Sequence, residues 1–560
     1  MWKLILVLIV ICANAQSQDS LTGKKEISIF ENGALKKKTI LNPQPNNGQQ
    51  YTNPLTISNP LTILGNNTFV RWSFVDPIAI GDFTLVSGNG KYNVTSWNLN
   101  TERISLYNNL NSNPLWEYFT DPNVFLSFLT ISDTGGVIGT GSYHNIYLFN
   151  NTGNIPFFNF DLTLLADTGI ATGLEITSNG KFLVGSVSRQ DSSTILGFNS
   201  TSNSPVWSRK IIPTVTVGGA GIQGVRMSAN DSLVIVNTYA EFYVIKTYTG
   251  QLVFQGLVNP TSPNSGTQAA QGISRNGNII ATINYSGFLR VYQWNGLTYN
   301  FLWSNQEPPG IFFNWYTCVE VSDDGQNIAA GTLNFLTSSS YDGKIKLFKT
   351  SGSGTPVWTY AGCGDEVSAV SFSKSGNILS ASSWGEFNNL SEDLFIFKTF
   401  LGGIPIFKLN TTGSLFYCST SNDGRTVTTS GKAVHARQFG NGGLLYNIDV
   451  DTSDIPTSIG NSNESINNFK LFQNYPNPFN PKTVISYQLA ISGYTTLRVY
   501  DVLGNQIKTL VNQNQIPGTY EVEFDGSVLS SGIYFYKIWV STPTGEAGSF
   551  SDTKKLILLK

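Results

Sequence analysis

The chain has 560 residues, and 40% of them are hydrophobic, so it can bury a large core and disorder is not expected for its body. Only 12% of the residues are charged and the formal net charge is −2. The nearest thing to a basic stripe is the short run Lys36–Lys38, which argues against nucleic acid as a partner.

The first 15 residues have the features of a secretory signal peptide. Lys3 supplies one positive charge, the apolar run Leu4–Cys12 is too short to span a bilayer, and Ala13-Asn14-Ala15 is a small-residue cleavage site. We therefore expect export through the inner membrane and a mature N-terminus at Gln16. No later stretch holds about 18 consecutive apolar residues, so a membrane span is not expected.

Two polar segments flank the body of the chain. Residues 16–68 form an N-terminal extension, in which Lys25 to Gly33 and the apolar positions that follow predict a β-hairpin. Residues 450–466 are rich in Asp, Ser, Thr and Asn and are typical of a linker. Between them, residues 69–449 contain an internal repeat.

The repeated segment is an apolar residue, Ser or Thr, two mostly polar residues and then Gly, followed by an apolar run. Seven copies are aligned on Ser132, Thr177, Ser228, Ser274, Ser322, Ser373 and Ser421, with gaps of 45, 51, 46, 48, 51 and 48 residues. A period near 48 that is built of strands and turns indicates a β-propeller with four strands in each blade. We expect the last repeat, which ends at Tyr446–Asp449, to supply its own four strands.

The last residue of each motif is predicted to lie in a tight hairpin turn with positive φ, which Gly tolerates best. These turn residues are Gly135, Gly180, Asp231, Gly277, Gly325, Gly376 and Gly424. The block resembles the WD40-like and quinoprotein-like propeller superfamily, where a turn of this type is common. A degenerate eighth copy at Ile80–Phe83 and the length of the block favour eight blades over seven.

Aromatic residues recur on the fourth strand of several repeats, at Trp116, Trp207, Trp303 and Trp358. A glycan-binding platform is one interpretation. Packing between blades is the preferred one, because recurrence in register is what the core of a blade requires.

The sequence contains no recognisable catalytic, cofactor-binding or metal-binding motif. His144 and His435 are the only histidines and lie in different repeats, which excludes a three-histidine zinc site. Gly219–Gly224 matches G-x-G-x-x-G, but a strand rather than a helix is expected after it, so an inter-blade loop is preferred to a nucleotide site. Asp449, Asp451 and Asp454 lack the other parts of an EF-hand, so we interpret them as solvated residues rather than calcium ligands.

Removal of the signal peptide leaves three cysteines, Cys318, Cys363 and Cys418. The number is odd, so at least one cysteine is unpaired or pairs between chains, and the low frequency of cysteine excludes a disulfide scaffold. A single bridge between Cys318 and Cys363 and three buried thiols that act as small apolar residues are both open.

Residues 467–560 carry several separated motifs. They begin near Asn474-Tyr475-Pro476-Asn477-Pro478, continue through Asp501–Asn505 and Gly532–Lys537, and end at Lys554–Lys560. This order resembles the C-terminal sorting domain of the type IX (Por) secretion system of Gram-negative bacteria. On that resemblance the sorting-motif residues are Tyr475, Pro476, Asn477, Pro478, Gly504, Gly532, Lys555 and Lys560.

The resemblance implies delivery to the outer-membrane surface or the medium, with the secretion machinery as a partner of this segment. The same residues also predict an Ig-like β-sandwich, with strands at Thr483–Leu489 and Tyr520–Phe524 and a rigid proline-containing loop before them. The two interpretations are compatible.

The sequence therefore predicts an all-β protein with a propeller and a small sandwich. We expect an exported module that binds a protein or glycan and has no catalytic role. A polysaccharide lyase or hydrolase with a carboxylate site at the propeller mouth, and a passive envelope protein, are the alternatives. Clustered carboxylates in the central channel would favour the enzyme, and an exposed apolar or aromatic face would favour binding.

Overall fold

A computed structural model describes residues 24–31, 34–41, 67–99, 102–120, 126, 128–142, 144–164, 170–189, 191–215, 221–258, 272–309, 314–337, 340–388, 390–453, 470–489, 493–515, 518–541 and 550–560. The predicted signal peptide lies outside these residues. The expected hairpin of the N-terminal extension is present, because β1 (Lys24–Glu31) pairs antiparallel with β2 (Ala34–Leu41).

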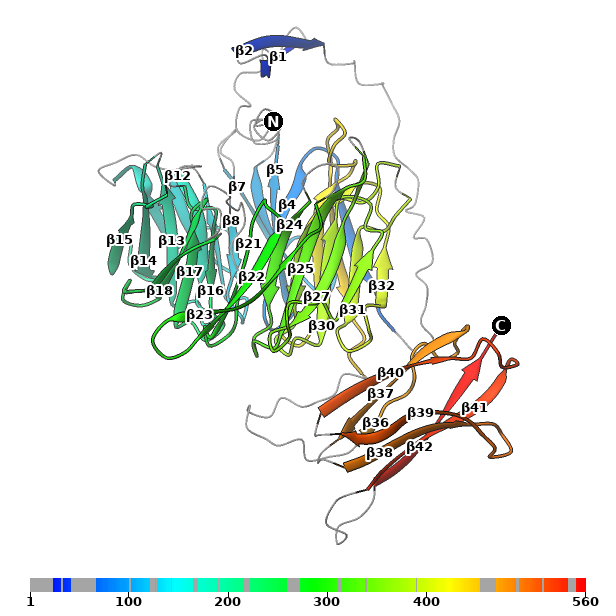
Figure 1. Cartoon of the computed structure of the whole chain (residues 1–560). Coiled ribbons are helices and arrows are strands. Elements are labelled where there is room, and N and C mark those ends of the chain that lie inside the picture. The colour runs from blue at the N-terminus through cyan, green and yellow to red at the C-terminus, as the bar shows by residue number, and fades with distance from the viewer. Residues whose placement is uncertain are drawn as a thin grey trace. The chain divides into compact units, whose positions relative to one another are not determined.

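The middle of the chain is a β-propeller (Figure 1). In the described residues, its strands form eight sheets, each with a path of four antiparallel strands. The first four blades are β4 (Ile80–Val86), β5 (Tyr92–Asn98), β6 (Arg103–Asn108) and β7 (Trp116–Phe119); β8 (Phe128–Ile131), β9 (Val137–Gly141), β10 (Asn145–Asn150) and β11 (Phe158–Asp161); β12 (Ile170–Ile176), β13 (Phe182–Ser188), β14 (Ser193–Asn199) and β15 (Trp207–Ile211); and β16 (Gly224–Met227), β17 (Leu233–Asn237), β18 (Glu241–Lys246) and β19 (Leu252–Leu257). The 3-10 turn η1 (Leu162–Leu164) follows β11.

The other four blades continue in chain order. They are β20 (Gly272–Ile273), β21 (Ile279–Ile283), β22 (Phe288–Trp294) and β23 (Tyr299–Gln306); β24 (Trp315–Val321), β25 (Asn327–Phe335), β27 (Lys344–Lys349) and β28 (Trp358–Ala361), with β26 (Tyr341–Asp342) paired to β25; β29 (Val367–Phe372), β30 (Ile378–Ser383), β31 (Leu394–Lys398) and β32 (Pro405–Leu409); and β33 (Ser414–Thr420), β34 (Thr426–Lys432), β35 (Gly443–Asp449) and β3 (Phe69–Asp76). Eight blades are therefore present, as the repeat length favoured.

The last blade corrects one expectation. Its fourth strand is β3, which precedes the first blade in the chain, so the final repeat supplies three strands and the N-terminal side supplies the fourth. Arg71 in β3 donates to Asp449 in β35 at 2.6 Å, and the backbone N–H of Asn67 donates to Asp451 at 3.0 Å. Two of the three aspartates considered as calcium ligands thus fasten this closure, while Asp454 lies outside the described residues.

Hydrophobic residues fill the spaces between neighbouring blades, and the four recurring tryptophans link one blade to the next. Each indole N–H donates to a backbone carbonyl just after the third strand of the next blade. The pairs are Trp116 to Asn151 at 3.2 Å, Trp207 to Thr247 at 2.9 Å, Trp303 to Thr350 at 2.8 Å and Trp358 to Thr399 at 3.3 Å. The side chains are buried or half-buried, so the packing interpretation of these residues is confirmed.

The C-terminal region is a sandwich of two antiparallel sheets. One contains β36 (Lys470–Leu471), β37 (Lys482–Leu489) and β40 (Gly518–Asp525), and the other runs in the order β39 (Gln506–Gln515), β38 (Gly493–Tyr500), β41 (Gly532–Ser541) and β42 (Phe550–Leu558). Residues of both sheets share one core that includes Ile485, Leu497 and Tyr536. The two expected strands lie within β37 and β40.

Candidate functional site

The strand order gives the propeller two different faces. Successive strands of a blade are antiparallel, so the turns between first and second strands lie at one end, called here the turn face. The loops between second and third strands, and the connections between blades, lie at the other end, called here the loop face.

The turn face is built by the repeated motif. In every blade the motif Ser or Thr oxygen accepts a hydrogen bond of 2.9–3.1 Å from the backbone N–H five residues later. The predicted turn residues have φ between 60° and 75°, and Asp231 stands at 60° where the other copies have Gly. These residues shape hairpins, because positive φ is what a turn of this type requires.

The eighth copy of the turn is Ser87-Gly88-Asn89-Gly90, not Ile80–Phe83, which belongs to β4. Gly90 has φ of 69°, and Ser87 precedes Ser132 by 45 residues, which is one of the observed gaps. The spacing alone could have found this copy. A Cβ at Gly88 would lie 2.4 Å from the side-chain Nδ2 of Asn422, so a larger residue there would have to displace that side chain.

Backbone hydrogen bonds link these turns around the channel. Six bonds of 2.8–3.0 Å join the turns of neighbouring blades, for example from Asn89 to Asp133, from Asp133 to Ser178 and from Asn422 to Gly88. Six of the eight junctions between blades are therefore linked by backbone hydrogen bonds at the turn face.

Inside the channel, charged side chains from facing blades meet. Glu175 on β12 lies 3.6 Å from Arg226 on β16, and both Glu320 on β24 and Tyr417 on β33 interact electrostatically with Arg226. Burial raises the pKa of Glu175 and of Glu320 to about 7, and the Arg226 charge opposes that rise. Glu320 also accepts the backbone N–H of Phe372 in the next blade at 3.3 Å, so it helps to join two blades.

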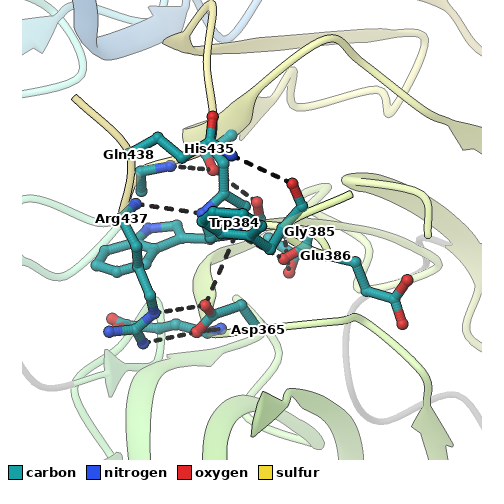
Figure 2. A network of polar contacts seen from close by, with 12 residues as sticks. Asp365, Trp384, Gly385, Glu386, His435, Arg437 and Gln438 are labelled. Atoms are coloured by element: carbon teal, nitrogen blue, oxygen red, sulfur yellow. Dashed lines mark hydrogen bonds and ion pairs between the residues drawn. The ribbon is translucent and has the colours of Figure 1, made fainter. Parts of the chain in front are cut away.

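The loop face carries a polar network centred on Arg437 (Figure 2). The Arg437 guanidinium binds the Asp365 carboxylate at two points, with Nε–Oδ2 at 2.6 Å and Nη2–Oδ1 at 2.8 Å. The same guanidinium lies 3.9 Å from the ring centroid of Tyr341 and 5.2 Å from that of Trp384. Asp365 is buried whereas Arg437 is 23% exposed, so the network holds one cation at the surface in a fixed position.

His435 belongs to this network but does not form a catalytic pair. Its Nδ1 accepts the backbone N–H of Arg437 at 3.2 Å, so Nε2 carries the proton and donates to the Gly385 carbonyl at 3.1 Å. Burial lowers the pKa of His435, which keeps the ring neutral. The ring therefore positions the loop that carries Arg437. His144, the other histidine, lies in a loop of the second blade and does not belong to the Arg437 network.

Aromatic side chains extend the network around the loop face. Successive ring centroids lie 5.1–6.3 Å apart from Tyr239 to Tyr285, Trp315, Phe335 and Tyr341, and Arg437 then connects Tyr341 to Trp384. We call these six aromatic residues the aromatic arc. All six residues are half-buried.

Three apolar side chains project beside one end of the arc. Phe387 and Leu390 lie in the loop of the seventh blade and are 59% and 77% exposed, and Phe439 in the loop of the eighth blade is 98% exposed. Phe387 packs against His435 with ring centroids 5.6 Å apart, and Gln438 donates to its carbonyl, so the two loops contact each other. Sequence reasoning missed this face, because its residues come from separate loops with no shared spacing.

The cysteines and the glycine motif have structural explanations. Cys318, Cys363 and Cys418 are all free, so the Cys318–Cys363 bridge is wrong. Burial raises the pKa of all three thiols, that of Cys418 to about 12, which leaves them unreactive small core residues. Gly224 of the G-x-G-x-x-G match begins strand β16 rather than a helix, and Gly219 lies outside the described residues.

The sorting-motif residues near the start of the tail lie against its last strand. Asn477 accepts the backbone N–H of Ile557 at 2.8 Å and donates to the carbonyl of Lys555 at 3.2 Å. The Tyr475 backbone pairs with Val484 in both directions at 2.8–2.9 Å, and the peptide bonds before Pro476 and Pro478 are cis. The loop therefore joins β37 to β42.

The other sorting-motif residues lie at turns and strand ends. Gly504 has φ of 85° in the turn that Asp501 closes, and Gly532 is the first residue of β41. Lys560, at the end of the chain, donates through its backbone N–H to Ser531 at 2.9 Å and through Nζ to the Ser527 carbonyl at 2.5 Å. The sorting-motif residues thus lie in the loops, turns and strand ends of the sandwich.

Comparison with known families agrees with this tail. Residues 473–557 match the family described as "Secretion system C-terminal sorting domain". A sorting domain of this kind implies interaction with the secretion machinery and export to the outer-membrane surface or the extracellular space. In the described part of the chain, no helix has the length and apolar character that a membrane crossing requires.

Two further comparisons add little. No curated protein matches the sequence. Among solved structures, the β-propeller domain of Myceliophteria thermophila Cps50 (Swd1) is similar at 10% identity and a TM-score of 0.42, over 55% of this chain and 96% of that one. At that score the likeness carries no weight, and the propeller is assigned from the order of its strands.

Proposed function

We propose that this protein is an exported, non-catalytic binding module that takes a protein partner on the loop face of its propeller. The observation that carries the proposal is the aromatic arc with the projecting side chains of Phe387, Leu390 and Phe439 beside it. Exposed apolar patches of this kind mark interaction surfaces. The Trp, Tyr and Arg residues of the arc and its network are the types that dominate binding energy at protein interfaces.

The Arg437 network supports the proposal because it prepares a cation before any partner arrives. Asp365, Tyr341 and Trp384 fix the guanidinium in one place, so little side-chain entropy remains to be lost on binding. A partner that offers a carboxylate or a carbonyl at this point meets a donor that is already oriented. The sorting domain supports the export half of the proposal.

The test is a protein and glycan array probed with the purified mature chain and two variants. Phe387→Ser with Phe439→Ser removes the two aromatic members of the three projecting side chains on the loop face. Leu297→Ser is the matched control, because Leu297 is 84% exposed in a turn on the opposite face. We expect the array to identify protein ligands of the parent chain, which the loop-face variant binds at least tenfold more weakly and the control variant binds normally. Two results would contradict the proposal: a loss of binding in the control variant alone, or an array on which the parent chain binds only glycans.

One observation favours a second candidate. The channel carboxylates Glu175 and Glu320 have raised pKa values of about 7, a feature of groups that exchange protons near neutral pH. A polysaccharide lyase or hydrolase would use them as acid and base. Turnover in a polysaccharide screen that Glu320→Gln abolishes would establish this enzyme and replace the binding proposal. A chain that binds no ligand and turns over no substrate would favour the passive envelope protein.

A further inference from the structure

The sandwich presents an unusual outer face on its four-stranded sheet. Along β38, Leu497 and Val499 point into the core, so Arg498 and Tyr500 point outward. A hollow of about 540 Å³ lies over this face, and Tyr494, Arg498, Tyr500, Lys537 and Trp539 are among its lining residues. We call these five residues the outer sheet face.

Among the described residues of the domain, the positive charges of this face have no acidic partner. Arg498 stands directly opposite Lys537 in the β38–β41 register, and like charges in that position repel. Their neighbours in the same row, Thr509 on β39 and Thr553 on β42, are neutral. Among the described residues neither cation has an ion pair with Asp or Glu, and the Arg498 Nε is buried without a hydrogen-bond acceptor.

A third cation lies in the next row of the same face. Lys555 on β42 is in register with Phe535 on β41, which is in register with Tyr500 on β38. Lys555 is exposed, and Leu556 beside it points into the core. Three strands of the sheet therefore contribute positive charge to one surface, and a negatively charged partner would relieve the repulsion between them.

The side chains around the cations indicate what kind of anion fits. Trp539 and Tyr494 are each 39% exposed on this face, and Trp, Tyr and Arg are the residue types most enriched at the centres of protein interfaces. An Arg fork binds a carboxylate at two points, whereas Lys binds as a point charge. The face thus combines flat aromatic area with two adjacent carboxylate-binding groups.

We propose that the outer sheet face is the docking surface of the sorting domain for an acidic protein of the secretion machinery, whose Asp or Glu side chains bind Arg498 and Lys537. This inference rests on the export part of the proposed function and not on the ligand of the propeller. Its failure would leave the loop-face proposal intact, because the two are read out by different experiments.

The first test follows export of the full chain in a Gram-negative host with a type IX system. Arg498→Glu with Lys537→Glu reverses both charges, and we expect the external fraction to fall at least fivefold while protein accumulates in the periplasm. Lys482→Glu is the matched control, because Lys482 is exposed on the other sheet, where it pairs with Glu523. Normal export of the double variant, or an equal loss with the control, would overturn the proposal.

A second test separates docking from folding and from binding to lipid. Arg498→Gln with Lys537→Gln removes the charges without adding new ones, and thermal unfolding of the purified chain checks that it folds. In calorimetric titration with poly-L-glutamate, we expect the parent chain to bind and this variant to have an affinity at least tenfold lower. Unchanged binding would overturn the proposal, as would binding to phosphatidylglycerol vesicles with none to poly-L-glutamate, since the surface would then recognise a membrane.

Discussion

The closing strand of the propeller is fastened to the first blade by a buried ion pair. Asp76 at the end of β3 binds Arg103 on β6 at 2.6 Å, and their side chains are 10% and 7% exposed. Arg103 also binds Glu117 at 2.9 Å. If this pair holds the ring shut, removing the Asp76 charge will destabilise the whole propeller.

Asp76→Asn tests the charge alone. Asp76 Oδ1 accepts the backbone N–H groups of Ile78 and Ala79 at 2.8 and 2.7 Å, and an asparagine oxygen can keep those bonds. Breaking a buried ion pair by removing one partner costs about 3–5 kcal/mol. Arg103 keeps Glu117, so we expect a loss near the lower end, about 3 kcal/mol.

Asp449→Asn is the control, because it breaks the other ion pair of the same closure. Its partner Arg71 is 20% exposed and Asp449 is 39% exposed, so we expect a loss of about 0–1 kcal/mol. Urea unfolding of the purified mature chain, followed by circular dichroism, measures both variants. Equal losses in the two would refute the reasoning that burial makes the Asp76–Arg103 pair the main fastening.

Three further predictions concern the turns, pH and the tail. Gly325→Val should cost about 1–3 kcal/mol in thermal unfolding because φ there is 71° and a Cβ would lie 3.1 Å from Ile279, whereas Gly153→Val, with no atom near, should have little effect. Burial raises the pKa of Asp393 from 3.8 to about 8, so between those pH values the folded chain holds a proton that the unfolded chain has lost, and the free energy of unfolding should fall as pH rises. In Asp393→Asn the urea midpoint should therefore fall less between pH 5 and pH 8 than in the parent. A fall as large as that of the parent would contradict this explanation. Deleting residues 467–560 should leave a folded propeller in the periplasm, and cell fractionation that finds it in the medium, or finds it degraded, would count against the domain boundary.

The parts of the fold that were predicted correctly depend on short-range chemistry. The motif serine accepts a hydrogen bond from the backbone N–H five residues later, and its turn residue needs positive φ. Each hairpin therefore requires a recognisable pattern of residue types within six consecutive residues, and this pattern is the mark of a blade. Repetition of that mark near every 48 residues indicated the blades and favoured eight of them. Alternating residues likewise predicted the strands of the tail, whose motifs carried the family resemblance.

The candidate site could not be predicted in the same way. Asp365 and Arg437 are separated by 72 residues, and Tyr239 and Trp384 of the aromatic arc lie in different blades. No spacing rule connects loops that the ring brings together. His435 and the three cysteines were visible as residue types, but their burial and hydrogen bonds, which decide that they are structural, exist only in the folded chain.

The sequence by itself determined the blade repeat, the hairpin turns and the export tail, because local hydrogen bonds and the alternation of apolar residues depend only on residues that are close together in the chain. Tertiary structure alone decided how the ring closes, since β3 pairs with β35 across some 378 residues through contacts such as Arg71–Asp449. It also decided which loops share a face, and which cations of the outer sheet face lack an ion pair within the part of the chain that the structure describes. Those properties depend on which distant side chains come within a few ångströms of one another, and the order of residues along the chain does not specify that distance.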